Sequence, residues 1–139
     1  MQFLLQLTVI HPALLSRPET TVKIENPPYM SLTVENIGLG PRGLPALSIC
    51  HYGELNGDLM RDPEMCFELS NPLGMGWILA PYYFRNDYMG VEQYSRNREG
   101  ENYVFVRDLL HQHESFARTW DKNIRAQGFV EAFERSRNQ

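Results

Sequence analysis

The alternation of apolar and polar residues between residues 29 and 96 is the feature that most limits the folds open to this chain. Residues 30–35 alternate with period two, a pattern typical of a strand with one buried face. Similar segments follow at 46–55, 64–70, 77–85 and 90–96, separated by turns rich in Gly, Pro, Asn and Asp. Short strands joined in this way predict an antiparallel meander of about five strands.

The last third of the chain is predicted to be helical. Apolar and aromatic side chains recur every three or four residues from Val106 to Ile124, which places a wide apolar stripe on a helix over about 105–127. Gly128 stands where a left-handed C-cap belongs. Neither the apolar face of the sheet nor the helix stripe is stable alone in water. We therefore expect an α+β fold in which the long C-terminal helix packs on one face of the sheet.

The length of 139 residues is typical of one domain. We predict a single domain over 1–139, with an irregular or short N-terminal element at 1–28, the β-sheet at 29–96 and the C-terminal helical part at 104–136. Residues 2–15 fit a short helix that Pro12 interrupts, but they fit a strand equally well. Residues 16–28 contain three prolines and are predicted to be an irregular connector.

Charge and cysteine content narrow the function classes. A net charge of -4 gives no support for general attraction to nucleic acid or to membrane surfaces. Cys50 and Cys66 are too few for a secreted disulfide framework, and we expect two buried thiols. No segment reaches the ~18 apolar residues that span a bilayer, and the N-terminus lacks the basic start and cleavage site of a signal peptide. We therefore expect a cytoplasmic protein.

Residues 51–64 contain several side chains that could bind a metal ion or act as acids and bases. If a hairpin curls there, a divalent cation or an acid/base pair could be held by His51, Glu54, Asp58, Asp62 and Glu64. The alternative is an ordered eight-residue loop over 56–63 with bends at Asn-Gly and Asp-Pro, in which the two aspartates bond to loop amides. We favour this structural role, and we assign no catalytic residue, metal or cofactor.

Aromatic and charged residues near the fourth and fifth strands favour binding. Arg85 is expected either to pair with Asp62 or Glu64 across the sheet or to recognise an anion. The aromatic residues of this region are Tyr82, Tyr83, Phe84, Tyr88, Tyr94 and Tyr103. Those on the sheet face opposite the helix would form a patch suited to a protein partner.

Arg118, Lys122 and Arg125 form a basic strip beside the apolar stripe of the predicted helix. Such a strip could follow a phosphate backbone, as in a DNA-binding accessory protein. Basic residues interspersed with Glu114 and Asp121 more often form a solvated helix face with intrahelical ion pairs.

Four segments resemble a known family: NPPYMSLTVENI, HYGELNGDLMRDPEMCFEL, YYFRNDYMGVEQY and FARTWDKNIRAQGF. They match in order over roughly residues 26–129. They are similar to small proteins of unknown function carried on bacterial plasmids and integrative conjugative elements. The resemblance implies a bacterial, cytoplasmic, mobile-element setting and supplies no catalytic residue.

We predict a non-enzymatic binding or accessory protein that engages a protein partner through an acidic and aromatic sheet surface, without membrane contact. The candidate binding residues are Tyr52, Asn56, Arg85, Asp87, Tyr88, Arg118 and Lys122. One alternative is a metal-dependent enzyme acting on nucleic acid and centred on 51–64. The other is a DNA-binding accessory that uses the C-terminal helix.

Overall fold

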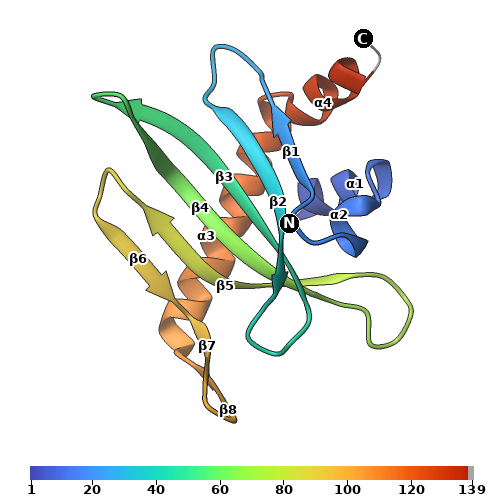
Figure 1. The fold of residues 1–139 in the computed structure, drawn as a ribbon, viewed down its shortest axis with the longest axis vertical. Coiled ribbons are helices and arrows are strands. Elements are labelled where there is room, and N and C mark those ends of the chain that lie inside the picture. The colour runs from blue at the N-terminus through green and yellow to red at the C-terminus, as the bar shows by residue number, and fades with distance from the viewer. Residues whose placement is uncertain (138–139) are drawn as a thin grey trace.

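In the computed structural model, which describes residues 1–137, helices cover one face of an antiparallel sheet (Figure 1). The strands lie across the sheet in the order β1 (Thr21–Ile24), β2 (Ser31–Leu39), β3 (Pro45–Leu55), β4 (Asp58–Ser70), β5 (Ile78–Asn86) and β6 (Val91–Tyr94). A separate hairpin consists of β7 (Arg96–Glu99) and β8 (Asn102–Phe105). The helices are α1 (Gln2–Ile10), α2 (Ala13–Ser16), α3 (Arg107–Ala126) and α4 (Phe129–Arg137). The predicted α+β meander with a long C-terminal helix is confirmed.

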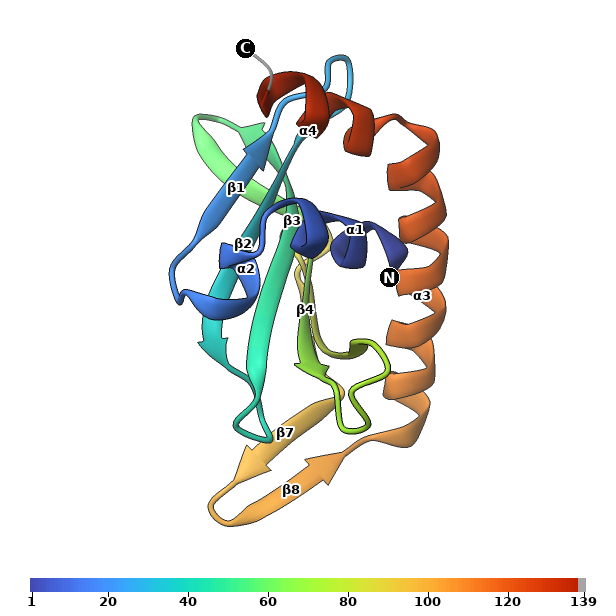
Figure 2. The same ribbon diagram turned by 90° about the vertical axis from the view of Figure 1, so that its right-hand side faces the viewer.

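The main core lies between the sheet and the helices. Figure 2 shows α3 standing away from the sheet, with α1 in the space between them. The strands contribute alternating residues such as Leu47 and Ile49, and α3 contributes Trp120 and Ile124. Phe3 of α1 is buried in the same cluster, so the N-terminal helix is part of the core.

The sheet is larger than the sequence pattern indicated. Residues 21–24, predicted to be irregular, form β1, which pairs antiparallel with β2 and buries Val22 and Ile24. This prediction was wrong because pairing with β2 and burial of alternate side chains outweigh the prolines on either side. The β7–β8 hairpin was also missed. Gly128 has a φ of 86° directly after the C-cap of α3, so its predicted role is confirmed.

The predicted eight-residue loop over 56–63 is wrong. Asn56 and Gly57 have φ angles of 53° and 87°, the left-handed conformations that a two-residue hairpin turn requires. Strand β4 starts directly afterwards at Asp58 and continues through the Asp-Pro pair. Asp62 and Pro63 form a bulge, because these two residues of β4 stand opposite the single residue His51 of β3. A proline has no amide to donate to the sheet, so a bulge accommodates it within a strand.

The bulge at Asp62 and Pro63 changes which side chains of β4 face each side of the sheet. In an unbroken strand, Arg61 and Glu64 would point to opposite faces. With the bulge between them, both point away from the helices, opposite Tyr52 and Cys50 in the register with β3. A second irregularity occurs in β5 directly after Pro81.

Among residues 1–137, no helix combines the length and the apolar character needed to cross a membrane.

Candidate functional site

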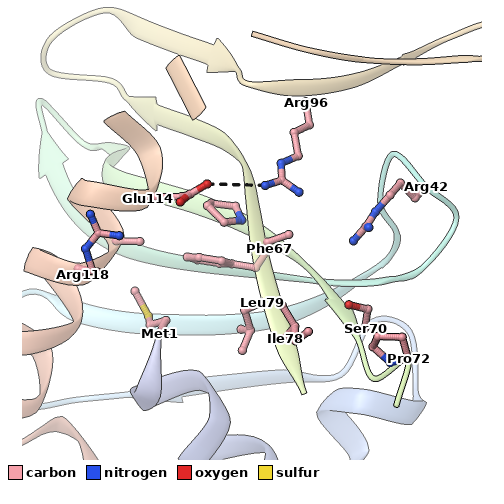
Figure 3. Close-up of a pocket in the computed structure, with 13 residues that line it drawn as sticks. Met1, Arg42, Phe67, Ser70, Pro72, Ile78, Leu79, Arg96, Glu114 and Arg118 are labelled. Atoms are coloured by element: carbon pink, nitrogen blue, oxygen red, sulfur yellow. Dashed lines mark ion pairs between the residues drawn. The ribbon is translucent and has the colours of Figure 1, made fainter. Parts of the chain in front are cut away.

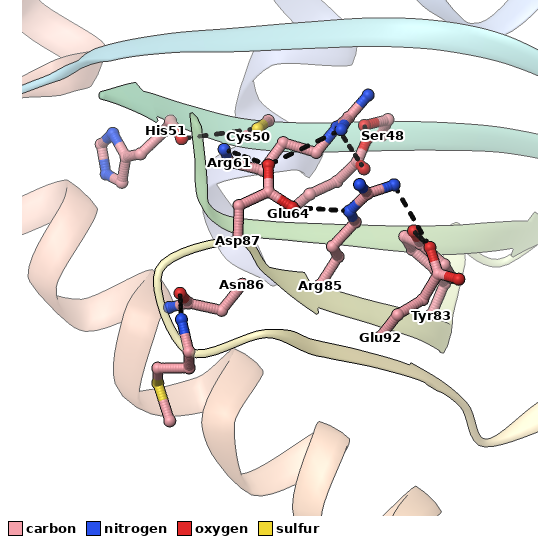
Figure 4. Close-up of polar contacts among 11 residues, drawn as sticks. Ser48, Cys50, His51, Arg61, Glu64, Tyr83, Arg85, Asn86, Asp87 and Glu92 are labelled. Atoms are coloured by element: carbon pink, nitrogen blue, oxygen red, sulfur yellow. Dashed lines mark hydrogen bonds and ion pairs between the residues drawn. The ribbon is translucent and has the colours of Figure 1, made fainter. Parts of the chain in front are cut away.

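The sheet face turned away from the helices, here called the open face, carries a network of hydrogen bonds and ion pairs (Figure 4). The network joins strands β3 to β6 and the turn after β5, and its members are Ser48, Arg61, Glu64, Tyr83, Arg85, Asp87 and Glu92. Three carboxylates and two guanidinium groups give it a formal charge of -1 (2 − 3), a count taken over these seven side chains.

Arg61 connects Glu64 of β4 with Asp87 of the turn after β5. Its Nε lies 3.3 Å from Glu64 Oε1, and its backbone amide donates a 2.8 Å hydrogen bond to Asp87 Oδ2. Glu64 also accepts a 2.5 Å hydrogen bond from Ser48 Oγ on β3. Each of these side chains is therefore held by partners on a neighbouring strand or turn.

Arg85 connects Asp87 with Glu92 of β6. Its Nε donates a 2.7 Å hydrogen bond to Asp87 Oδ1, and its Nη1 lies 3.3 Å from Glu92 Oε2. Tyr83 Oη donates to the same Glu92 oxygen at 2.7 Å. The planar guanidinium thus bridges two carboxylates that come from the turn after β5 and from β6.

Three members of the network have shifted pKa values. The pKa of Asp87 is lowered, first by the hydrogen bond from the Arg61 amide and then by Arg85. The hydrogen bond to Asp87 raises the pKa of Arg85, and burial with the Glu92 contact raises the pKa of Tyr83. These three groups therefore keep one charge state at neutral pH, which suits recognition better than proton transfer.

The rim of the open face is exposed and aromatic. Tyr52, Arg61 and Arg85 are partly exposed, and Tyr94 is 49% exposed. Tyr94 packs edge-on against Tyr83, with the ring centroids 4.8 Å apart. A shallow hollow of about 310 Å³ beside the network is lined by Arg85, Asp87, Gly90, Val91 and Glu92.

Cys50 and Cys66 lie on the same face, and both are buried and free, as the sequence predicted. Burial is the main cause that raises the pKa of the Cys50 thiol to about 12. Burial also raises the pKa of Cys66 well above its usual range. Both thiols are therefore protonated at neutral pH and unsuited to nucleophilic chemistry.

The five candidate residues for an enzyme site do not come together. His51 faces the helices, where its ring lies 5.6 Å from that of Trp120 and 5.4 Å from that of Phe129. Glu54 and Asp58 stand at the exposed end of the β3–β4 hairpin. Asp62 accepts a 2.9 Å hydrogen bond from Asn86 on β5, in place of the predicted loop amide, and Glu64 alone joins the network. Within the described residues 1–137, no group of three His, Cys, Asp or Glu side chains is placed to hold a metal ion.

The candidate binding residues fall into separate places. Arg85 and Asp87 are in the network, although Arg85 pairs with Asp87 and Glu92 and not with Asp62 or Glu64. Tyr52 lies beside the network, opposite Arg61 in the strand register. Tyr88 lies on the helix side of β3, where a Cβ at Gly53 would be 2.6 Å from its Oη. The others lie elsewhere: Asn56 at the hairpin turn, and Arg118 and Lys122 on α3.

Three members of the network, namely Ser48, Arg61 and Glu92, were not predicted from the sequence, and Tyr83 was predicted only as an aromatic residue of this region. Pro63 was the available signal, because a proline inside a strand marks a bulge that changes the side-chain alternation. On α3, the predicted intrahelical pairing is confirmed for Arg125, whose Nη2 lies 3.0 Å from Asp121 Oδ2.

Two buried histidines predict how stability depends on pH. Burial lowers the pKa of His51 and of His113, whose Nδ1 lies 2.7 Å from Ser95 Oγ. Both are neutral in the fold, whereas the unfolded chain takes up protons near pH ~6.5, the ordinary histidine value. Their contribution to stability is therefore complete above that pH and is lost as the pH falls through the lowered folded values.

Urea unfolding followed over a pH series checks this expectation. His51→Gln and His113→Gln, made singly, are each expected to flatten the dependence of the unfolding free energy on pH in the weakly acidic range. His111→Gln, at an exposed position on the same helix as His113, is the control and should keep the wild-type slope. A wild-type slope in both buried-site variants would contradict the prediction.

Comparison with known proteins identifies the family of this chain and does not identify an activity. No curated protein and no solved structure is similar enough to this chain to count as a match. The match to a family model extends from residue 3 in α1 to residue 130 in α4, so it includes the sheet, the open-face network and α3. The chain therefore belongs to the family described as "Domain of unknown function (DUF6908)", whose model matches residues 3–130.

Proposed function

We propose that this protein is a non-enzymatic accessory protein of a bacterial mobile element and that it binds a protein partner in the cytoplasm through its open face. The mobile-element setting rests on the four sequence segments quoted above. The binding role rests on one observation: a sheet face without a covering helix displays partly exposed arginines that neighbouring carboxylates already hold in place.

This arrangement suits a protein partner for two reasons. Arg61 and Arg85 are fixed by Glu64 and Asp87, so binding costs little of the side-chain entropy that a free arginine would lose. The exposed tyrosines at the rim supply rigid apolar area with a polar end, and tyrosine and arginine are the residue types enriched at interface hot spots. The complementary surface would carry hydrogen-bond acceptors for the guanidinium groups and apolar side chains for Tyr52 and Tyr94.

The two other functions have less support. A metal-dependent enzyme centred on 51–64 would need His51 beside the acidic residues, but His51 packs against Trp120 and Phe129 on the helix side. A DNA-binding strip on α3 would need Arg125 available, but Arg125 is paired with Asp121. The network's charge of -1, from two guanidinium groups and three carboxylates, also disfavours a polyanion at the open face.

A comparative pull-down tests the proposal. The tagged wild-type protein and a variant carrying Tyr52→Ala and Tyr94→Ala are incubated with host-cell lysate, and the bound proteins are quantified by mass spectrometry. The double variant is expected to lose the specific partner, because removing two tyrosines from the open face weakens binding by about tenfold or more. The affinity of the identified partner is then measured by calorimetry with the purified proteins.

Tyr103→Ala is the matched control, since Tyr103 is also an exposed tyrosine but lies on β8, outside the six-stranded sheet. It should retain the partner at the wild-type level. Retention of the partner by the double variant, or equal loss in the double variant and the control, would count against the open face as the binding surface.

A further inference from the structure

A cavity of about 510 Å³ lies on the helix side of the sheet, on the other side from the open face (Figure 3). Its walls are α3, the start of α1, strands β4 and β5, and the turn between β2 and β3. Three arginines from distant parts of the sequence line it, namely Arg42, Arg96 and Arg118. Glu114 is the one acidic side chain among the described lining residues, so the lining carries a formal charge of +2 (3 − 1).

Arg96 places its guanidinium group beside this cavity. Its side chain is only 17% exposed, and its Nε is buried without a hydrogen-bond partner among residues 1–137. Glu114 Oε1 lies 3.8 Å from Arg96 Nη2, which is an ion pair too long to be a hydrogen bond. The donors of Arg96 that a ligand in the cavity can approach are therefore its outer guanidinium nitrogens, which this long contact leaves without a hydrogen bond in residues 1–137, whereas Nε is closed off by burial.

Arg42 is positioned for the same role. Glu68, which is fully buried, accepts a 3.0 Å hydrogen bond from Arg42 Nε and a 2.7 Å hydrogen bond from the Arg42 amide. These two contacts use Nε and leave the outer edge of the guanidinium available to a ligand. Figure 3 shows Arg42 and Arg96 reaching toward the cavity from two different elements, the β2–β3 turn and β7.

Apart from Ser70, the rest of the lining is apolar. Phe67 and Leu79 come from the adjacent strands β4 and β5, and Ala117 comes from the buried face of α3. A cavity of this size exceeds the space that an isolated inorganic ion needs, and sites of about 300–1,000 Å³ with an apolar wall and few polar groups hold small organic molecules.

We propose that this cavity binds a small organic anion, with a phosphate or carboxylate group against Arg96 and Arg42 and a ring-sized apolar body against Phe67 and Leu79. Planar guanidinium groups recognise the oxygen pairs of either anion through paired hydrogen bonds. The anion accepts hydrogen bonds from the outer nitrogens of the Arg96 and Arg42 guanidinium groups. This site is separate from the surface proposed for the protein partner.

Nuclear magnetic resonance of the full chain tests the proposal, because arginine Nε–H groups give resolved signals. Phenyl phosphate, benzoate, inorganic phosphate and phenol are titrated in turn into the wild-type protein. The two aromatic anions are expected to shift the Arg96 Nε–H signal and the amides of cavity residues in a saturable way at millimolar concentrations or below. The stronger aromatic anion identifies the phosphate or the carboxylate as the preferred group.

Inorganic phosphate is expected to bind about tenfold more weakly than the preferred aromatic anion because it lacks the apolar body, and phenol is expected to give no saturable shift. Arg96→Gln should weaken the preferred anion by about tenfold or more. Arg98→Gln is the matched control on the same strand, where Arg98 Nε donates to the Gly100 carbonyl outside the cavity, and it should bind as the wild type does.

Shifts scattered over the surface, equal binding of phenol and the anions, or no saturable shift with either aromatic anion would each overturn the proposal. The wild-type titration alone distinguishes these outcomes, so the test stands even if Arg96→Gln does not fold.

Discussion

Phe3→Ala is expected to lower the free energy of unfolding by about 4 kcal/mol, within the range for a large aromatic side chain removed from a core. Phe3 is 0% exposed and packs in the main core between the sheet and α3. Its backbone amide also donates a 2.9 Å hydrogen bond to the buried carboxylate of Asp121, which ties the start of α1 to α3. Urea unfolding followed by circular dichroism measures the loss.

Val9→Ala is the matched control, since Val9 lies on the same helix but is 79% exposed. Its unfolding free energy should stay within about 0.5 kcal/mol of the wild type. Similar small losses in both variants would mean that α1 does not dock between the sheet and α3. A large loss in Phe3→Ala alone would establish the N-terminal helix as a core element.

Glu68→Ala is expected to cost about 3 kcal/mol of unfolding free energy. The Glu68 side chain is 1% exposed, and its carboxylate accepts hydrogen bonds from the amides of Arg42 and Leu44 as well as from Arg42 Nε. Without it, these donors in the β2–β3 turn lose their acceptor in a buried place. Glu101→Ala, at an exposed position in the β7–β8 turn, should change the unfolding free energy by no more than about 0.5 kcal/mol.

A double-mutant cycle with Gly40 tests the same contact independently. A Cβ at Gly40 would overlap Cγ of Glu68, so Gly40→Ala is expected to destabilise the wild-type protein. In the Glu68→Ala background the overlapping atom is gone, and the cost of Gly40→Ala should be smaller. Strictly additive losses would contradict the close packing of Glu68 under the turn, because residues in contact are expected to couple.

Local sequence patterns were sufficient for the fold class. The alternation of apolar and polar residues over 46–55 predicted a strand, and β3 spans Pro45–Leu55. Local sequence patterns were insufficient for β1, because a segment of four residues between prolines is too short to show whether it is a strand or a connector. Pairing with β2 supplies the hydrogen bonds that decide the matter.

The candidate site was harder to predict than the fold. Treating Asp62 and Pro63 as a loop bend separated Arg61 from Glu64, whereas the bulge at these residues brings both to the open face. Arg85 pairs with Asp87 of the turn after β5 and with Glu92 of β6. Residue spacing alone could not distinguish this pairing from a pairing of Arg85 with Glu64, which stands opposite Arg85 in the register of β4 with β5.

The sequence by itself determined the antiparallel meander, the long amphipathic helix and the burial of both cysteines, because period-two and period-3.6 patterns are local and depend on near neighbours. Only the tertiary structure decided which charges meet on the open face and which arginines line the cavity. Arg42, Arg96 and Arg118 lie far apart in the sequence and share one cavity through strand register and helix packing. Such contacts depend on long-range geometry, which a single bulge can redirect.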